Sequence, residues 1–451
     1  MILFIISILV IFLLALVSSS ISVLVFSACI YLGGILICQT ISYENRIKGY
    51  FVLNIVFSIY MLFALFHYMD AVVDWGYFAN PGRDEYKFWN ESIYFSQYAS
   101  IGQIVKDCLW GDIVFYETRG YILYVGIIAY LADHIFDGNN LLLQFLGSVL
   151  WGVLMSVVFY KICLLYLGSK KSVKYALFYS LCTVAFVYSF KLLRDIHVAF
   201  FYMLSIYIVL KKFSIKGLLL LLLNVIIVWQ LRLEHGLFLL VFVSYYLYDK
   251  VKRYPVLVGL LCIVIMGVFI TYFMQSLETV NRSMEHYTEY TSDDALARDN
   301  SLGAVIYRLP SPLKEIAIVF YSQIQPFPSW YNLSNATNVY AGITSSVDIV
   351  VSAFWSIAMM SSFVWLLFYG MYKRIPNKFL YLLLIAITFL FLNTSNMNMR
   401  RIMCVYPIFF ILYVWMKEYC VPRLKYIRTF RLSIFVYICM YAIYMVVKHV
   451  R

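Results

Sequence analysis

The chain of 451 residues has 63% hydrophobic and 13% charged side chains, and its mean hydropathy of +0.83 lies far above the range of soluble globular proteins. This composition excludes a soluble fold, because a soluble protein of this length could not bury so much apolar surface in its core. A net charge of +12 would suggest a nucleic-acid partner in a soluble protein, but in a membrane protein the basic residues are first sorted by membrane side. We therefore expect an all-α polytopic membrane protein with no nucleic-acid partner.

Apolar segments that are candidates for membrane spans follow one another along the chain. They cover residues 2–17, 21–39, 51–69, 121–137, 141–166, 175–191, 196–210, 217–231, 236–248, 255–274, 349–370, 379–393, 402–416 and 432–447. The first segment lacks a basic flank and a small-residue cleavage site, so we expect it to stay as a span rather than to be removed as a signal peptide. We expect one integral membrane domain over residues 1–451.

Basic residues in the connections predict the orientation, because positive loops favour the cytoplasmic side. Six loops are basic: Arg46/Lys48, Lys170/Lys171/Lys174, Lys211/Lys212/Lys216, Lys250/Lys252/Arg253, Lys373/Arg374/Lys378 and Arg423/Lys425/Arg428/Arg431. The outer, periplasmic side then receives the short turns 192–195, 232–235 and 394–401 and the long loops 70–120 and 275–348. Residues 121–137 must be re-entrant or interfacial for the alternation to hold, which leaves about 13 spans.

The predicted orientation places every acidic residue except Glu44, Asp249 and Glu418 on the outer side. Positive-inside bias redistributes Lys and Arg but says little about acids, so this surplus needs a separate cause. Simple hydration of a long loop would explain the acids of 275–300. It does not explain acids in short turns between apolar helices, and we expect the functional face to be the outer one.

The first outer loop places two adjacent carboxylates, Asp84 and Glu85, among aromatic residues. A carboxylate near the membrane surface can act as a general base for a sugar hydroxyl. Tyr86 and Trp89 offer flat faces on which a sugar can stack. The competing interpretation is an interfacial aromatic belt with solvated acids, since Tyr and Trp favour this depth in any membrane protein.

Two successive outer turns repeat one design, an Arg followed closely by an acid: Arg194-Asp195 and Arg232-Leu233-Glu234. The planar fork of Arg suits phosphate, and we count Asp195 and Glu234 as catalytic candidates with the arginines as phosphate ligands. The alternative is a pair of ordinary ion pairs at helix ends.

The second long loop carries Arg308 and Trp330 in a lid-like stretch with an amphipathic run at 316–324. We assign Arg308 to phosphate binding and Trp330 to sugar stacking; a packed cap without chemistry is the alternative. Arg400 and Arg401 then re-enter the membrane at the depth of a lipid phosphate, where binding of anionic lipid alone is the alternative.

The order of these motifs resembles the GT-C superfamily of membrane glycosyltransferases. The matching residues are Arg83-Asp84-Glu85-Tyr86, Asn140-Leu141-Leu142 with Lys170-Lys171, Leu193-Arg194-Asp195, Leu231-Arg232, Leu309-Pro310, Pro326-Phe327-Pro328, and Arg400-Arg401 before Tyr406-Pro407. Within that superfamily the chain is most similar to bacterial O-antigen or capsule repeat-unit polymerases (Wzy type). The arginine-rich loops of those polymerases often show an Arg-to-Gly spacing that has no clean counterpart here.

The resemblance implies a GT-C-like bundle in a bacterial inner membrane and an inverting, metal-independent transfer that uses an undecaprenyl-pyrophosphate-linked oligosaccharide. In this interpretation Arg194, Arg232, Arg400 and Arg401 hold the leaving pyrophosphate, and Asp84 or Glu85 activates the acceptor hydroxyl. Its partners would be membrane lipids, the lipid-linked substrate and a chain-length regulator protein.

Two other functions stay open at this point. One is a GT-C transferase that uses a polyprenyl-phosphate monosaccharide, with Asp84 and Glu85 as its acidic motif and a divalent ion. The other is a flippase or transporter of lipid-linked oligosaccharides, although the chain lacks the internal repeats and mid-span charges expected of one. None of the nine cysteines has metal-site spacing, and we expect no metal and no cofactor for the polymerase.

Overall fold

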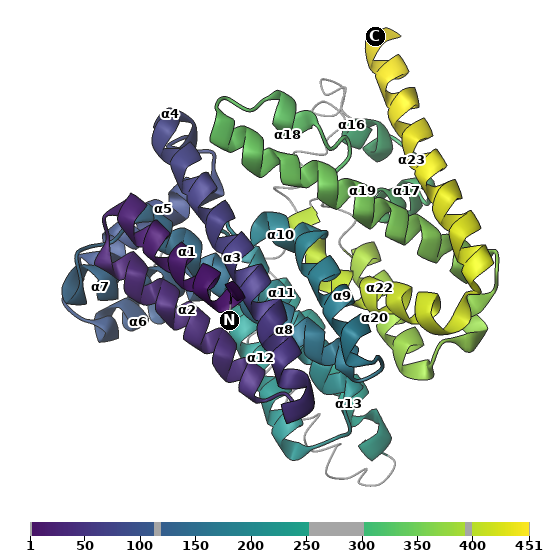
Figure 1. The fold of residues 1–451 in the computed structure, drawn as a ribbon, viewed down its shortest axis with the longest axis horizontal. Coiled ribbons are helices and arrows are strands. Elements are labelled where there is room, and N and C mark those ends of the chain that lie inside the picture. Colours follow the sequence, from purple (N-terminus) through teal and green to yellow (C-terminus); the bar gives the residue numbers. More distant parts are fainter. Residues whose placement is uncertain (1, 112–118, 252–301, 393–398, 451) are drawn as a thin grey trace.

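The computed structural model describes residues 2–111, 119–251, 302–392 and 399–450, and these ranges are helical with no strand (Figure 1). Six of the described helices are long and apolar enough to cross a membrane: Ile21–Gln39, Tyr43–Val73, Leu141–Leu164, Val339–Leu367, Met399–Cys420 and Arg423–Val446. Five shorter apolar helices accompany them: Ile2–Ser18, Asp195–Leu210, Ile215–Leu231, Leu233–Tyr248 and Asn377–Leu392. The expected all-helical membrane architecture is confirmed at this level.

The helices of the first half are α1 (Ile2–Ser18), α2 (Ile21–Gln39), α3 (Tyr43–Val73), α4 (Trp75–Phe78), α5 (Asp84–Ser96), α6 (Ile101–Trp110), α7 (Arg119–Ile135), α8 (Leu141–Leu164), α9 (Ser169–Leu181), α10 (Val184–Tyr188), α11 (Asp195–Leu210), α12 (Ile215–Leu231) and α13 (Leu233–Val251). The second half contains α16 (Leu302–Tyr307), α17 (Leu313–Ser322), α18 (Tyr331–Ser334), α19 (Val339–Leu367), α20 (Asn377–Leu392), α21 (Met399–Ile402), α22 (Tyr406–Trp415) and α23 (Arg423–Val450). Several starts are encoded locally: the side chains of Ser20, Asn140, Ser214 and Asn338 each accept a hydrogen bond from a backbone N–H of the first turn.

The centre of the bundle is formed by α3 and α8, which pack along one another. α1 and α2 cover one side of this pair, α9 and α11 cover another, and α19 brings α22 and α23 to the far side (Figure 1). Gly152 of α8 allows the close approach, because a Cβ there would lie 2.8 Å from the ring of Tyr60 and 2.7 Å from Ser189. The core is therefore built by helices from both halves of the chain.

Three predicted segments differ from the structure or lie outside it. Residues 175–191 do not form one span but two helices, α9 and α10, with a break at Cys182 and Thr183. α19 begins at Val339, so the predicted outer loop 275–348 ends inside a helix, and its described part also holds α16, α17 and α18. The expected span 255–274 lies outside the described residues.

Residues 121–137, predicted to be re-entrant or interfacial, fall on α7. This helix packs mainly against α5 and α6, the helices of the first outer loop, and less against α8 and α12. Asp137, just beyond α7, accepts hydrogen bonds from the backbone N–H groups of Ile21 and Ser22 at 2.7 and 2.8 Å. α7 thus belongs to a helical layer beside the start of α2.

The predicted inner and outer loops gather at different ends of the bundle. At the end predicted to be cytoplasmic, Lys161 bonds Thr40 at 2.7 Å and Lys171 pairs with Glu418 at 2.5 Å. At the other end Asn338 donates to Asp70 at 2.7 Å. The 31 residues of α3 lie between these ends and, at ~1.5 Å of rise each, make a rod of about 45 Å. The contacts separate the two ends of the bundle, and which end faces the cytoplasm stays a prediction.

Candidate functional site

The two short outer turns that carry Arg194-Asp195 and Arg232 meet in space. Nη1 of Arg232 lies 3.0 Å from Oδ1 of Asp195. Nη1 of Arg194 donates a hydrogen bond to the carbonyl oxygen of Leu231 at 3.4 Å. α11 begins at Asp195 and α12 ends at Leu231, so each contact joins the start of one helix to the end of the next.

Arg232 is almost completely enclosed. It is 2% exposed and its partner Asp195 is 3% exposed, while Glu234, at 3.6 Å from Nε of Arg232, has a side chain that is 44% exposed. Removing two charges from water costs several kcal/mol per ion unless they are paired, so Asp195 compensates the buried charge of Arg232. Asp195, expected from sequence to be catalytic, is therefore engaged by Arg232, and Glu234 is the more open of the two acids.

A third segment contributes Arg400, which pairs with α5. Nη1 of Arg400, on α21, lies 2.6 Å from Oδ2 of Asp84 in the first turn of α5. The two side chains are 23% and 39% exposed, so this pair lies at the open edge of the site. The structure thus brings Asp84 to the end of the bundle where the arginines gather.

The fourth arginine, Arg401, is half-buried beside the others. The charges of Arg401, Arg400 and Arg194 all act on the carboxylate of Asp195, in addition to that of Arg232. We call Arg194, Arg232, Arg400 and Arg401, with the acids Asp84, Asp195 and Glu234, the arginine cluster. Guanidinium groups from three separate segments therefore act on one buried carboxylate, which Arg232 alone pairs with directly among the printed contacts of these arginines, and such a concentration of positive charge suits an anion.

Glu85 points the other way from its neighbour Asp84. It is 5% exposed, and its Oε1 accepts hydrogen bonds from Nε2 of His67 at 2.9 Å and from the backbone N–H of Leu192 at 3.1 Å. Burial by itself would raise the pKa of Glu85, but the charge and hydrogen bond of His67 outweigh it. With further help from Lys191 and Arg83, the pKa of Glu85 falls to about 2. Glu85 is thus a weak base without room for a substrate, which leaves Asp84 as the better candidate for a general base.

Two polar residues of this region were not singled out from the sequence. His67 lies in α3 and Asp348, 3% exposed, in α19, where its Oδ2 accepts a hydrogen bond from Nδ2 of Asn332 at 2.6 Å. Lys191 acts electrostatically on both Asp348 and Glu85. The sequence did contain a signal for His67 and Asp348: each is an ionisable residue within or beside an apolar segment, and such a residue usually has a specific partner.

The remaining predicted site residues are dispersed. Arg308 is exposed directly after α16. Trp330 lies against α23, with its ring centroid 4.4 Å from that of Tyr441. Tyr86 and Trp89 are half-buried on α5, and Tyr86 meets Phe78 edge to face at 6.1 Å. Only the two α5 aromatics therefore lie on the element that carries Asp84.

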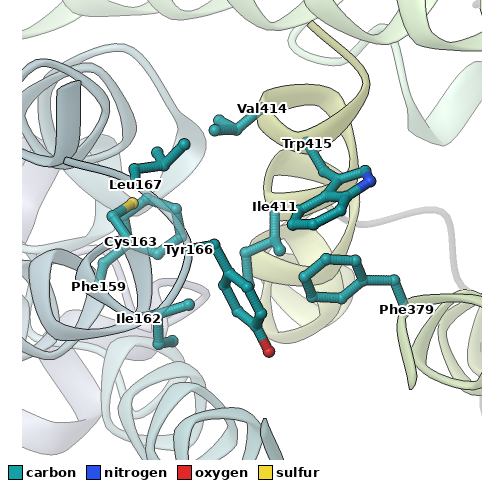
Figure 2. Close-up of a pocket in the computed structure, with 9 residues that line it drawn as sticks. All are labelled: Phe159, Ile162, Cys163, Tyr166, Leu167, Phe379, Ile411, Val414 and Trp415. Atoms are coloured by element: carbon teal, nitrogen blue, oxygen red, sulfur yellow. The ribbon is translucent and has the colours of Figure 1, made fainter. Parts of the chain in front are cut away.

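Two apolar hollows lie between helices away from these charges. Figure 2 shows the first, a narrow one where side chains of α8 face those of α20 and α22. It is lined by Phe159, Ile162, Cys163, Tyr166, Leu167, Phe379, Ile411, Val414 and Trp415. The second, of about 290 Å³, lies between α13 and α20 and is lined by Phe238, Val241, Ser244, Tyr245, Tyr248, Tyr381, Leu384, Ile385 and Thr388. Neither lining contains a charged residue, so the arginine cluster, and not a hollow, is the candidate site.

No protein-family model, curated protein or solved structure matches the chain.

Proposed function

We propose that the chain is a membrane glycosyltransferase of GT-C type, with about 13 transmembrane helices, located in a bacterial inner membrane. It would polymerise undecaprenyl-pyrophosphate-linked oligosaccharide repeat units into O-antigen or capsule on the outer face. The observation that carries this proposal is the gathering of four arginines from three segments at one end of an apolar bundle, next to the half-exposed carboxylate of Asp84.

The arginines suit the leaving group of such a reaction. A pyrophosphate has several negatively charged oxygens in a small volume, and guanidinium forks bind such oxygens with two parallel hydrogen bonds. A polyprenyl chain keeps its pyrophosphate at the edge of the hydrocarbon layer, the depth at which a charged end of an apolar helix bundle lies. Fixed cations there would stabilise the charge that develops as the donor bond breaks.

The proposed step uses Asp84 as the base. An acceptor hydroxyl oxygen attacks the anomeric carbon of the donor sugar from the face opposite the pyrophosphate, and its proton passes to Asp84. The bond from that carbon to the pyrophosphate oxygen breaks, the electron pair stays on the oxygen, and the new glycosidic bond has inverted configuration. Arg400, 2.6 Å from Asp84, would pass to the pyrophosphate when the donor binds, which leaves the carboxylate of Asp84 to accept the proton.

One observation favours a polyprenyl-phosphate monosaccharide as the donor instead. Asp195, Asp84 and Glu234 lie 3.0, 2.6 and 3.6 Å from cluster arginines and already offset much of their charge. The remaining positive charge would be enough for a single phosphate. The two donors predict different products, a polymer or a single added sugar.

Deletion of the gene in its host tests the proposal and does not require the sugars to be identified. Gel electrophoresis of surface polysaccharide should show the ladder of repeats collapse to a single repeat, and the intact gene should restore it. Arg400→Ala should fail to restore the ladder, whereas Arg46→Ala, at the opposite end of the bundle, should restore it. Loss of one sugar from every repeat would support the monophosphate donor, and repeats trapped on the cytoplasmic side would support a flippase; either result contradicts the polymerase.

A further inference from the structure

We infer that Glu85 and His67 are a positioning pair, which holds the Lys191–Asp195 turn against α5 and thereby fixes Asp84 relative to the arginine cluster. The contacts themselves are independent of any activity, but the consequence for transfer rests on the proposed function. In this assignment the two adjacent acids of the first outer loop have different tasks. Asp84 meets the substrate, and Glu85 acts through its neighbours.

One carboxylate joins three elements. Oε1 of Glu85, on α5, accepts from Nε2 of His67, on α3, and from the N–H of Leu192, in the turn between α10 and α11. Oε2 faces Nη2 of Arg83 at 3.9 Å. Because an ionised carboxylate only accepts hydrogen bonds, Nε2 of His67 must carry a hydrogen here.

The imidazole is held by packing as well as by this bond. Its ring centroid lies 4.7 Å from that of Phe145 and 5.9 Å from that of Phe190. His67 and Glu85 are each 5% exposed, so water does not compete for their contact. A hydrogen bond between such groups is strong because the surroundings are of low dielectric constant.

The position of Glu85 determines where two functional groups lie. Successive residues of a helix point about 100° apart, so Asp84 faces the open edge and Arg400 when Glu85 faces inward. Leu192 is followed within three residues by Arg194 and Asp195, which begin α11. A displacement of about 1 Å between base and leaving-group site can lower a rate ~100-fold. Loss of the pair should therefore impair transfer even though neither residue touches substrate.

Paired substitutions separate positioning from catalysis. Glu85→Gln keeps a carbonyl oxygen for the Leu192 N–H but removes the acid–base group, whereas Glu85→Ala removes both. In proteoliposomes with lipid-linked repeats we expect Glu85→Gln to keep the transfer rate within about threefold of wild type and Glu85→Ala to lose ~30-fold or more. Glu91→Gln, the same change on the same helix, is the matched control.

The pH profile and the conservative change at His67 add readouts that a merely structural role would not produce. Glu85→Gln should keep the acid limb of the rate profile, because the proposed base, Asp84, is unchanged. His67→Gln, which keeps an N–H donor, should retain far more activity than His67→Ala. If Glu85→Gln is as inactive as Glu85→Ala and the acid limb disappears, Glu85 is the base and the inference is overturned.

Amide hydrogen exchange tests the pair even if the proposed function is wrong. Exchange at Leu192, normalised to the amides of α8, should accelerate at least ~10-fold in Glu85→Ala and stay near the wild-type value in Glu85→Gln. Unchanged protection in Glu85→Ala would contradict the positioning role. Absence of polymer from wild type with the expected exchange pattern would contradict only the proposed function.

Discussion

Oδ2 of Asp84 lies 2.6 Å from Nη1 of Arg400, so the start of α5 and the short helix α21 meet although they are far apart in the sequence. The pair is half-exposed at the open edge of the arginine cluster, where an incoming anion could take over the guanidinium. The proposed base and the proposed ligand of the leaving group are thus adjacent before any substrate arrives.

Asp84→Asn should abolish transfer while the protein stays folded. The amide keeps the shape of the carboxylate and a hydrogen-bond acceptor for Arg400, but it cannot take a proton, and loss of a general base typically lowers a rate by about 10²–10⁴-fold. Transfer is measured in proteoliposomes and folding by thermal unfolding in detergent. Wild-type transfer by Asp84→Asn would remove this carboxylate from the reaction.

Arg232→Ala should destabilise the protein strongly. The substitution leaves the buried carboxylate of Asp195 without its partner at 3.0 Å, and breaking a buried pair in this way costs about 3–5 kcal/mol. The double variant Asp195→Asn/Arg232→Gln removes both charges and should recover part of the loss. Equal unfolding midpoints for wild type and Arg232→Ala would mean that the pair is not buried as described.

Because of Glu85, the free energy of unfolding should depend on pH below about pH 4.5. Its pKa in the folded protein is about 2, below the ordinary value of 4.5, so its ionised form stabilises the fold above pH 4.5. This contribution, on the order of 3 kcal/mol, is lost as the pH falls from 4.5 towards 2. Wild type should unfold at higher temperature than Glu85→Gln at pH 7, and the difference should shrink over that interval; a constant difference would contradict the lowered pKa.

Trp330→Ala should loosen the C-terminal helix rather than weaken donor binding. The indole packs on Tyr441 and Tyr444 of α23, and removal of such aromatic contacts costs about 1 kcal/mol. Proteolysis within α23 should accelerate about fivefold, while the exposed Trp110→Ala control should leave it unchanged. A loss of donor binding without faster proteolysis would return Trp330 to the substrate site.

Composition and the distribution of charge predicted the helical membrane architecture and the grouping of the loops. Apolar content predicted a helical membrane protein, and the alternation of basic loops predicted which connections lie together. The Arg-acid turns at 194–195 and 232–234 were predicted to converge, because each placed charges at the same membrane side, and Asp195 and Arg232 do form an ion pair.

The break between α9 and α10 could not be predicted, because its cause is tertiary. The tertiary contact comes from Tyr60 on α3, whose hydroxyl donates to the carbonyl oxygen of Ser180 at 2.6 Å; locally, the hydroxyl of Thr183 donates to the carbonyl oxygen of Tyr179 at 2.7 Å. These contacts satisfy carbonyl groups at the end of α9 without Pro or Gly in the sequence.

The sequence also could not predict that Asp84 is half-exposed while Glu85 is buried. The rotation of α5 about its axis decides which acid faces inward, and that rotation is set by partners distant in the chain, His67 and Leu192. A pattern of adjacent acids carries no information on such contacts.

Binding of undecaprenyl pyrophosphate to the purified protein in liposomes tests the central claim most directly, since it needs neither the acceptor nor the identity of the sugars. Wild type should bind it more tightly than undecaprenyl phosphate, and Arg400→Ala and Arg401→Ala should each weaken binding about tenfold or more. Arg46→Ala should bind as wild type does. Equal affinity of all four proteins for the pyrophosphate would contradict the proposal that the arginine cluster holds a phosphorylated lipid carrier.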